Sequence, residues 1–108
     1  MLITVAQTTA FTVQAKAVGM SQAEIDHAID IVAANPTGGE SLGAGLYKVR
    51  VPRSGGGKSG GYRIITVFVS TDAPAVLVGV LSKSNQANFS HAALENMKSV
   101  SRTIRKGG

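Results

Sequence analysis

The chain has 108 residues and no cysteine, so it has room for one domain over residues 1–108 and cannot form a disulfide bond or a thiolate metal site. Eleven Lys and Arg against six Asp and Glu give a formal net charge of +5, which favours a polyanionic partner. Two histidines exclude an all-histidine metal cage, and three Phe, two Tyr and no Trp argue against a row of stacking rings.

The charge is divided unevenly along the chain. Residues 1–40 contain one base and four acids, a net charge of −3, whereas residues 41–108 contain ten bases and two acids, a net charge of +8. Between residues 41 and 71 there are five bases and no acid. This separation predicts a binding site for a polyanion on one part of the surface.

The longest nearly uncharged run lies between Arg63 and Lys83, with Asp72 and Pro74 in its middle. Both halves are rich in β-branched residues, which predicts two strands joined by a turn rather than a membrane helix. The start of the chain shows neither a basic segment nor a long apolar run. Because cysteine is also absent, we expect a cytoplasmic protein with no membrane contact.

The first half of the chain is predicted to hold a short strand at residues 3–6 and two helices. Thr8 or Thr9 caps the first helix, and Ser21 with Glu24 forms a capping box for the second. An Asn-Pro pair ends the second helix. The apolar faces at helical spacing are Phe11, Ala15 and Val18, and then Ile25, Ala28, Ile29, Val32 and Ala33.

The second half is predicted to hold three strands and a last helix. A glycine-rich connection covers residues 37–45, the strands cover 46–52, 62–70 and 75–83, and the helix begins after its cap Ser90. In the first of these strands Lys48 and Arg50 lie on one face, opposite the apolar face of Tyr47, Val49 and Val51. The order β-α-α-β-β-β-α predicts an α+β domain, with helices packed on one face of a small, mainly antiparallel sheet.

The loop between the first two of these strands is glycine-rich and carries Arg53 and Lys58. Its G-x-G-x-x-G pattern does not predict a nucleotide fold, because a strand follows where a helix N-terminus would have to receive phosphate. The cations on or beside the sheet are Lys48, Arg50, Lys58, Arg63 and Lys83. Each of them alone fits a solvated surface charge equally well, whereas the group without an acid favours a phosphate-binding site.

Three segments of this half resemble toxins of the RelE/ParE superfamily, in the RelE/HigB-like branch of type II toxin–antitoxin systems. They are the K-x-R strand at 46–51, the block GKSGGYRII at 57–65, and the hydrophobic strand that ends at Lys83. The resemblance covers about residues 2–98. It implies a RelE-like fold and a ribosome-dependent mRNA endonuclease, in which the ribose 2′-OH attacks the adjacent phosphate without a metal or other cofactor.

The resemblance also implies roles for single residues. Arg63 would hold the phosphate and Arg50 would be a second clamp. Lys58 and Lys83 are the alternatives for general base and acid. The residues expected to bind RNA are Lys48, Arg53, Tyr62, Tyr47 and His91, of which His91 is also an alternative proton donor or acceptor.

One position departs from the family pattern. Relatives often carry an aromatic residue two positions before the strand-terminal lysine, where this chain has Leu81. A second hypothesis therefore stays open, a non-catalytic protein of the same fold that binds RNA or a protein partner through its charge. A gyrase inhibitor of the ParE type is a third alternative.

The toxin hypothesis implies three partners. They are a cognate antitoxin of the helix-turn-helix, HigA-like kind, the ribosome and mRNA. DNA would be contacted only through the antitoxin.

Overall fold

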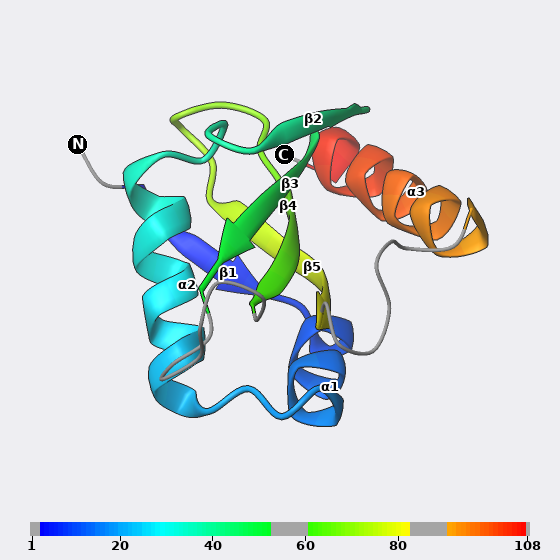
Figure 1. The fold of residues 1–108 in the computed structure, drawn as a ribbon. Helices are drawn as coiled ribbons and strands as arrows, with labels where there is room; N and C mark the ends of the chain where they lie inside the picture. Colours follow the sequence, from blue (N-terminus) through cyan, green and yellow to red (C-terminus); the bar gives the residue numbers. More distant parts are fainter. Residues whose placement is uncertain (1–2, 53–60, 83–90, 108) are drawn as a thin grey trace.

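The computed structural model describes residues 3–52, 61–82 and 91–107, and within these ranges three helices surround a five-stranded sheet (Figure 1). The strand order is β1-β5-β4-β3-β2. The elements are β1 (Val5–Gln7), α1 (Thr9–Ala17), α2 (Gln22–Ala34), β2 (Glu40–Gly43), β3 (Leu46–Val51), β4 (Tyr62–Val67), β5 (Ala75–Ser82) and α3 (His91–Gly107). The predicted α+β class and mainly antiparallel sheet are confirmed.

The described part of the sheet has one strand more than the sequence predicted. The glycine-rich connection at 37–45 contains β2, which pairs antiparallel with β3 and places Glu40 opposite Lys48. The turn between the two strands runs through Gly43, Ala44 and Gly45, whose φ angles are 83°, 54° and 78°. Glycine is favoured in such left-handed conformations. The glycines at 43 and 45, which led us to predict a loop, therefore form the turn that ends β2.

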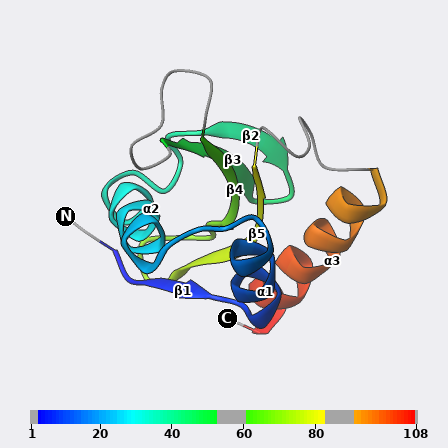
Figure 2. The same cartoon turned by 60° about the horizontal axis from the view of Figure 1, so that its bottom comes forward.

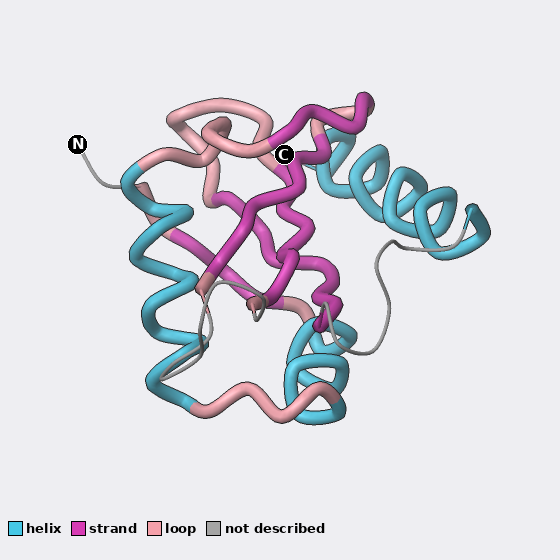
Figure 3. The backbone as a smooth tube through the Cα atoms, viewed as in Figure 1, coloured by secondary structure: helices cyan, strands magenta, loops and turns pink. Residues whose placement is uncertain are grey.

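Strand β5 lies inside the sheet, as its two apolar faces predicted (Figure 3). It pairs in parallel with β1 and antiparallel with β4, whereas β4 with β3 and β3 with β2 are antiparallel pairs. The apolar run that follows Arg63 thus forms most of β4 and then β5. Within the described ranges, no helix is long and apolar enough to cross a membrane.

The first two helices begin at the predicted caps. The Thr8 hydroxyl accepts a hydrogen bond from the backbone N–H of Phe11 at 3.1 Å. Ser21 and Glu24 form the capping box, in which the Ser21 hydroxyl accepts from the Glu24 N–H at 3.1 Å and the Glu24 carboxylate accepts from the Ser21 N–H at 2.8 Å. These bonds satisfy N–H groups that a helix start otherwise leaves without acceptors.

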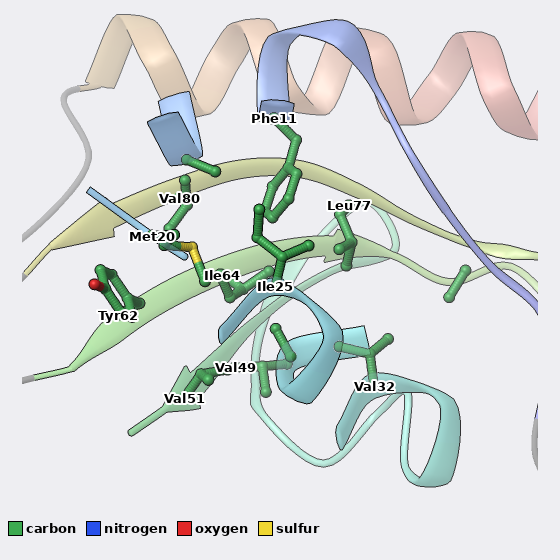
Figure 4. Close-up of a cluster of buried hydrophobic side chains, with 13 residues drawn as sticks. Phe11, Met20, Ile25, Val32, Val49, Val51, Tyr62, Ile64, Leu77 and Val80 are labelled. Carbon is green, nitrogen blue, oxygen red and sulfur yellow. The ribbon is translucent and has the colours of Figure 1, made fainter. Parts of the chain in front are cut away.

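Hydrophobic side chains are buried on both faces of the sheet. The larger cluster lies between the sheet and helices α1 and α2 (Figure 4). Its buried members are Phe11, Ala15, Met20, Ile25, Ala28, Val32, Val49, Val51, Tyr62, Ile64, Ala75, Leu77 and Val80. The smaller cluster lies beneath α3 and consists of Leu46, Ile65, Val67, Val78 and Met97.

The predicted packing of helices on one face therefore holds for α1 and α2, while α3 covers part of the opposite face. Figure 2 shows α2 and α3 on the two sides of β4. The reason lies in β4, where every residue from Ile64 to Val67 is buried. Because neighbouring strand residues point to opposite faces, such a strand needs cover on both sides.

Candidate phosphate-binding site

Arg50 and Arg63 lie side by side on the sheet. The antiparallel register of β3 and β4 makes them direct partners, so both side chains leave the same face, with Cβ atoms about 4.5–5.5 Å apart. Two like charges in this position destabilise a sheet. A phosphate between them removes the repulsion, because its oxygen atoms accept charge-assisted hydrogen bonds from both guanidinium groups. The pairing makes these two arginines the candidate anion site of the sheet.

The face that carries this pair has an apolar end and a cationic end. At the apolar end Leu46 is paired with Val67, and both are fully buried in the cluster beneath α3. Toward the other end follow Lys48 and then Arg50, which is exposed. We call Lys48, Arg50 and Arg63 the cationic face. The cationic face begins where the apolar cluster beneath α3 ends.

Arg63 is the more sheltered of the two arginines. Its side chain is partly buried, and its Nη1 atom is fully buried and has no hydrogen-bond partner within the described part of the chain. A buried donor without an acceptor costs free energy, and more so when it is charged. An anion bound at the pair would supply the acceptor, which makes Arg63 the residue best placed to hold a phosphate.

Lys48 is held at the edge of the cationic face by an ion pair. Its Nζ atom lies 3.4 Å from Oε2 of Glu40, the residue opposite it on β2. Sequence reasoning missed Glu40 because it missed β2. The available signal was a tight glycine turn at residues 43–45 with extended segments before and after it, which is typical of a hairpin.

Comparison with known proteins supplies the family. Residues 3–107 match the family described as RelE toxin of RelE / RelB toxin-antitoxin system. The chain belongs to the RelE toxin family. It is therefore a toxin of a toxin–antitoxin system with an antitoxin as its partner. A search of curated proteins found no match. The RelE family is generally one of endoribonucleases, and the HigB-like branch remains a prediction.

Two tyrosines that the sequence placed with the RNA ligands lie away from the cationic face of this RelE-family toxin. Tyr62 is fully buried in the larger cluster, and its hydroxyl donates to Oε1 of Glu24 at 3.3 Å (Figure 4). The expectation that Tyr62 binds RNA does not fit this position, since its side chain has no exposed surface. It precedes Arg63, and consecutive strand residues point to opposite faces. Tyr47, next to Lys48, lies on the opposite face for the same reason.

Leu81 lies in the same cross-strand row as the two arginines. The register of β4 and β5 places it opposite Arg63, and it is partly buried. The position where an aromatic residue was expected is thus a direct neighbour of the Arg50–Arg63 pair. In this RelE-family toxin the row contains two guanidinium groups and an aliphatic side chain.

The remaining predicted site residues of this RelE-family toxin stay predictions. Arg53, Lys58 and Lys83 lie outside the described residues, as does the predicted cap Ser90. His91 is the first residue of α3. Of the predicted cations, the described ranges bring together Lys48, Arg50 and Arg63.

Proposed function

We propose that this RelE-family toxin is an endoribonuclease that cleaves mRNA on the ribosome and is neutralised by its antitoxin. The observation that supports this most directly is the pairing of Arg50 with the sheltered Arg63. Like charges directly opposite each other destabilise a sheet, and a bound phosphate would offset that loss by accepting hydrogen bonds from both guanidinium groups. The general activity of the family makes the phosphate of RNA the natural ligand.

The proposed reaction is a phosphoryl transfer within the RNA strand. The 2′-oxygen attacks the adjacent phosphorus as the bond from phosphorus to the 5′-oxygen breaks. The products are a 2′,3′-cyclic phosphate and a 5′-hydroxyl end. The proton of the 2′-hydroxyl goes to a general base, and the departing 5′-oxygen receives a proton from a general acid.

In this reaction the two arginines stabilise the negative charge on the phosphoryl oxygens. The phosphoryl oxygens carry more negative charge in the transition state than in the ground state, so fixed guanidinium groups stabilise the transition state preferentially. Arg63 holds the phosphate and Arg50 clamps it from the neighbouring strand. Lys58 and Lys83 are the proposed base and acid, in either assignment.

The proposed partners follow the HigB-like branch of the family. The antitoxin is a helix-turn-helix protein of the HigA kind, and it alone contacts DNA. The toxin acts in the cytoplasm on mRNA in the ribosome, where Lys48 and Arg53 contact the RNA backbone.

The test is to induce the chain in cells without its antitoxin and to map the 5′ ends of mRNA. We expect new cuts within translated regions, in register with the reading frame, with 2′,3′-cyclic phosphate on the upstream fragments. The matched control is Arg63→Ala at the same protein level, which we expect to reduce the cuts about 10²- to 10³-fold. Absence of new ends with the wild-type protein present contradicts the proposal.

A second candidate function is favoured by Leu81. Its position opposite Arg63 puts an aliphatic side chain beside the phosphate site, where relatives often have an aromatic one. Such a protein would bind RNA or a partner by charge without cutting. It predicts salt-dependent RNA binding that Arg63→Ala weakens, with no cleavage by the wild type. Gyrase-dependent DNA damage without mRNA cuts would instead favour the ParE-type alternative.

A further inference from the structure

A second charged group adjoins the Arg50–Arg63 pair. The ion pair of Lys48 with Glu40 joins β3 to the edge strand β2. Lys48 and Arg50 are two residues apart on β3, so their side chains leave the same face about 6.7 Å apart along the strand. The cationic face thus offers a third positive charge, and this one is already paired with a carboxylate.

A pocket of about 380 Å³ lies at the edge of β3, between this strand and the C-terminal end of α2, and Val49 of the larger cluster also lines it. Its lining includes Ile31, Asn35, Gly39, Glu40, Lys48 and Arg50. The volume falls in the range of small-molecule sites, about 300–1,000 Å³. An apolar side chain, an amide and two cations match the needs of a nucleotide, which presents a base, a sugar and a phosphate.

The backbone before β2 places Glu40 at this pocket. The Gly38 N–H donates to the carbonyl oxygen of Asn35 at 3.1 Å. A Cβ atom at Gly39 would collide with the carbonyl oxygen of Lys48, so only glycine permits this close approach to β3. Glu40 follows directly, and its carboxylate is thereby held beside the Lys48 ammonium group.

We propose that Glu40 is an internal competitor of RNA. Its carboxylate forms an ion pair with Lys48, and a second RNA phosphate, next to the one at Arg50 and Arg63, binds in the pocket only when it replaces Glu40 as the partner of Lys48. This inference rests on the proposed function and deepens it. It names a second phosphate subsite next to the Arg50–Arg63 pair and the residue that limits its affinity.

The exposure of the two partners fits an exchangeable contact. The Glu40 side chain is 66% exposed, whereas the Lys48 side chain is 24% exposed. Exposed ion pairs are weak, corresponding to about a 1.4- to 5-fold effect on an equilibrium. A phosphate beside Lys48 also gains attraction from Arg50, two residues along β3, whereas Glu40 contacts Lys48 alone, from the edge strand β2. The carboxylate thus lowers affinity for polyanions in general without blocking the site.

The experiment measures RNA binding by Glu40→Gln. The probe is a single-stranded 2′-O-methyl oligonucleotide, which lacks the attacking hydroxyl and stays intact, and its Kd is determined over a series of NaCl concentrations. We expect binding about two- to five-fold tighter at low salt. The plot of log K against log salt should steepen by about 0.7, the value for one added phosphate contact on a single strand.

Asp72→Asn is the matched control, because it makes the same change in net charge. Asp72 is exposed in the turn after β4, at the opposite end of that strand from Arg63. We expect its salt slope to equal that of the wild type. In a Lys48→Gln background, Glu40→Gln should also lose its effect. Equal slopes for Glu40→Gln and Asp72→Asn, or weaker binding by Glu40→Gln, overturn the proposal.

Arg63→Ala in the same assay separates this inference from the proposed function. If Arg63→Ala weakens RNA binding and strongly reduces cleavage while Glu40→Gln changes neither, the proposed competition by Glu40 is wrong and the proposed endoribonuclease function stands. If Glu40→Gln tightens binding while the wild-type protein produces no new mRNA ends, the subsite stands and the proposed function fails. A wild-type protein that does not bind the probe at low salt overturns the inference, whereas mapping of mRNA ends still decides the function.

Discussion

The two faces of the sheet use the same strands for different purposes. Ile64 and Ile65 are neighbours on β4 and both are fully buried, one in the cluster under α1 and α2 and the other in the cluster under α3. Among the side chains that the structure describes, the first cluster has thirteen buried members and the second has five. The difference shows that one face is devoted to stability, while the other combines a small core with the cationic face.

The division of the second face follows from a conflict between burial and charge. A guanidinium group under a packed helix would lose its hydration without compensation. The cations therefore lie beyond the apolar cluster of α3, where a phosphate can reach them. The pairing of Arg50 with Arg63 lowers stability in the free protein, and the larger cluster on the opposite face offsets this loss.

The largest expected effect tests the two cores against each other. Ile64→Ala should lower the free energy of unfolding by about 4–5 kcal/mol and Ile65→Ala by about 2–3 kcal/mol, within the range of buried Ile→Ala changes. The cavity at residue 65 is partly filled if α3 shifts, whereas the larger cluster is closed by two helices. Urea unfolding gives both values, and amide exchange should show faster opening of α3 in Ile65→Ala. A larger loss for Ile65→Ala would reverse the comparison.

The next effect concerns catalysis on the cationic face. Arg63→Ala should reduce mRNA cleavage about 10²- to 10³-fold, because one preorganised charge no longer stabilises the transition state. Arg63→Lys should recover part of the loss, since a lysine restores charge without bidentate geometry. Cleavage of a reporter mRNA in a translating extract measures the rates. Full activity of Arg63→Ala would remove the cationic face from the mechanism.

Tyr62→Phe tests whether the tyrosine next to Arg63 belongs to the core or to the site. Loss of the hydroxyl that bonds to Glu24 should lower the free energy of unfolding by about 1–2 kcal/mol. The cleavage rate should stay within about two-fold of the wild type after correction for the folded fraction, because the ring lies on the other face. Thermal unfolding and the reporter assay give the two numbers. A strong loss of cleavage with an unchanged free energy of unfolding would mean that Tyr62 takes part in RNA binding or cleavage.

The smallest effect is expected for the stability of Arg50→Gln. Removing one of two paired like charges relieves repulsion, so the free energy of unfolding should rise slightly or stay within about 0.5 kcal/mol of the wild type. Urea unfolding at low and high salt checks this, and any gain should shrink as salt screens the pair. Destabilisation beyond about 1 kcal/mol, well outside the usual range of about 0.5 kcal/mol for a surface change, would mean that Arg50 stabilises the fold.

Much of the fold was predictable because local chemistry marks it. Thr8 caps a helix with its own hydroxyl, and Ser21 with Glu24 forms a box within four residues, so neither depends on distant parts of the chain. Strand β2 escaped prediction because its four residues are stabilised by pairing with β3 rather than by an alternating pattern.

The cationic character of the candidate site was predictable from the sequence, and so were some of its residues. Arg50 and Arg63 stood out as cations in an acid-free stretch, and strand alternation alone would have separated Arg63 from Tyr62. Their direct pairing depends on the register of β3 and β4, which is set by burial of Ile64 and Val49 on the opposite face. Glu40 could not be placed without its strand.

The sequence by itself determined the α+β fold class, because helix caps and apolar periodicity are local properties of the chain. It also indicated the RelE family, because the basic block at residues 57–65 is a local motif. It also determined which residue types are available to bind phosphate. Only the tertiary structure decided which of them meet. It paired Arg50 with Arg63, moved Tyr62 into the core, placed Leu81 beside the arginines and brought Glu40 to Lys48. The physical reason is that register and helix cover arise from contacts between residues far apart in the chain, which minimise exposed apolar surface across the whole sheet.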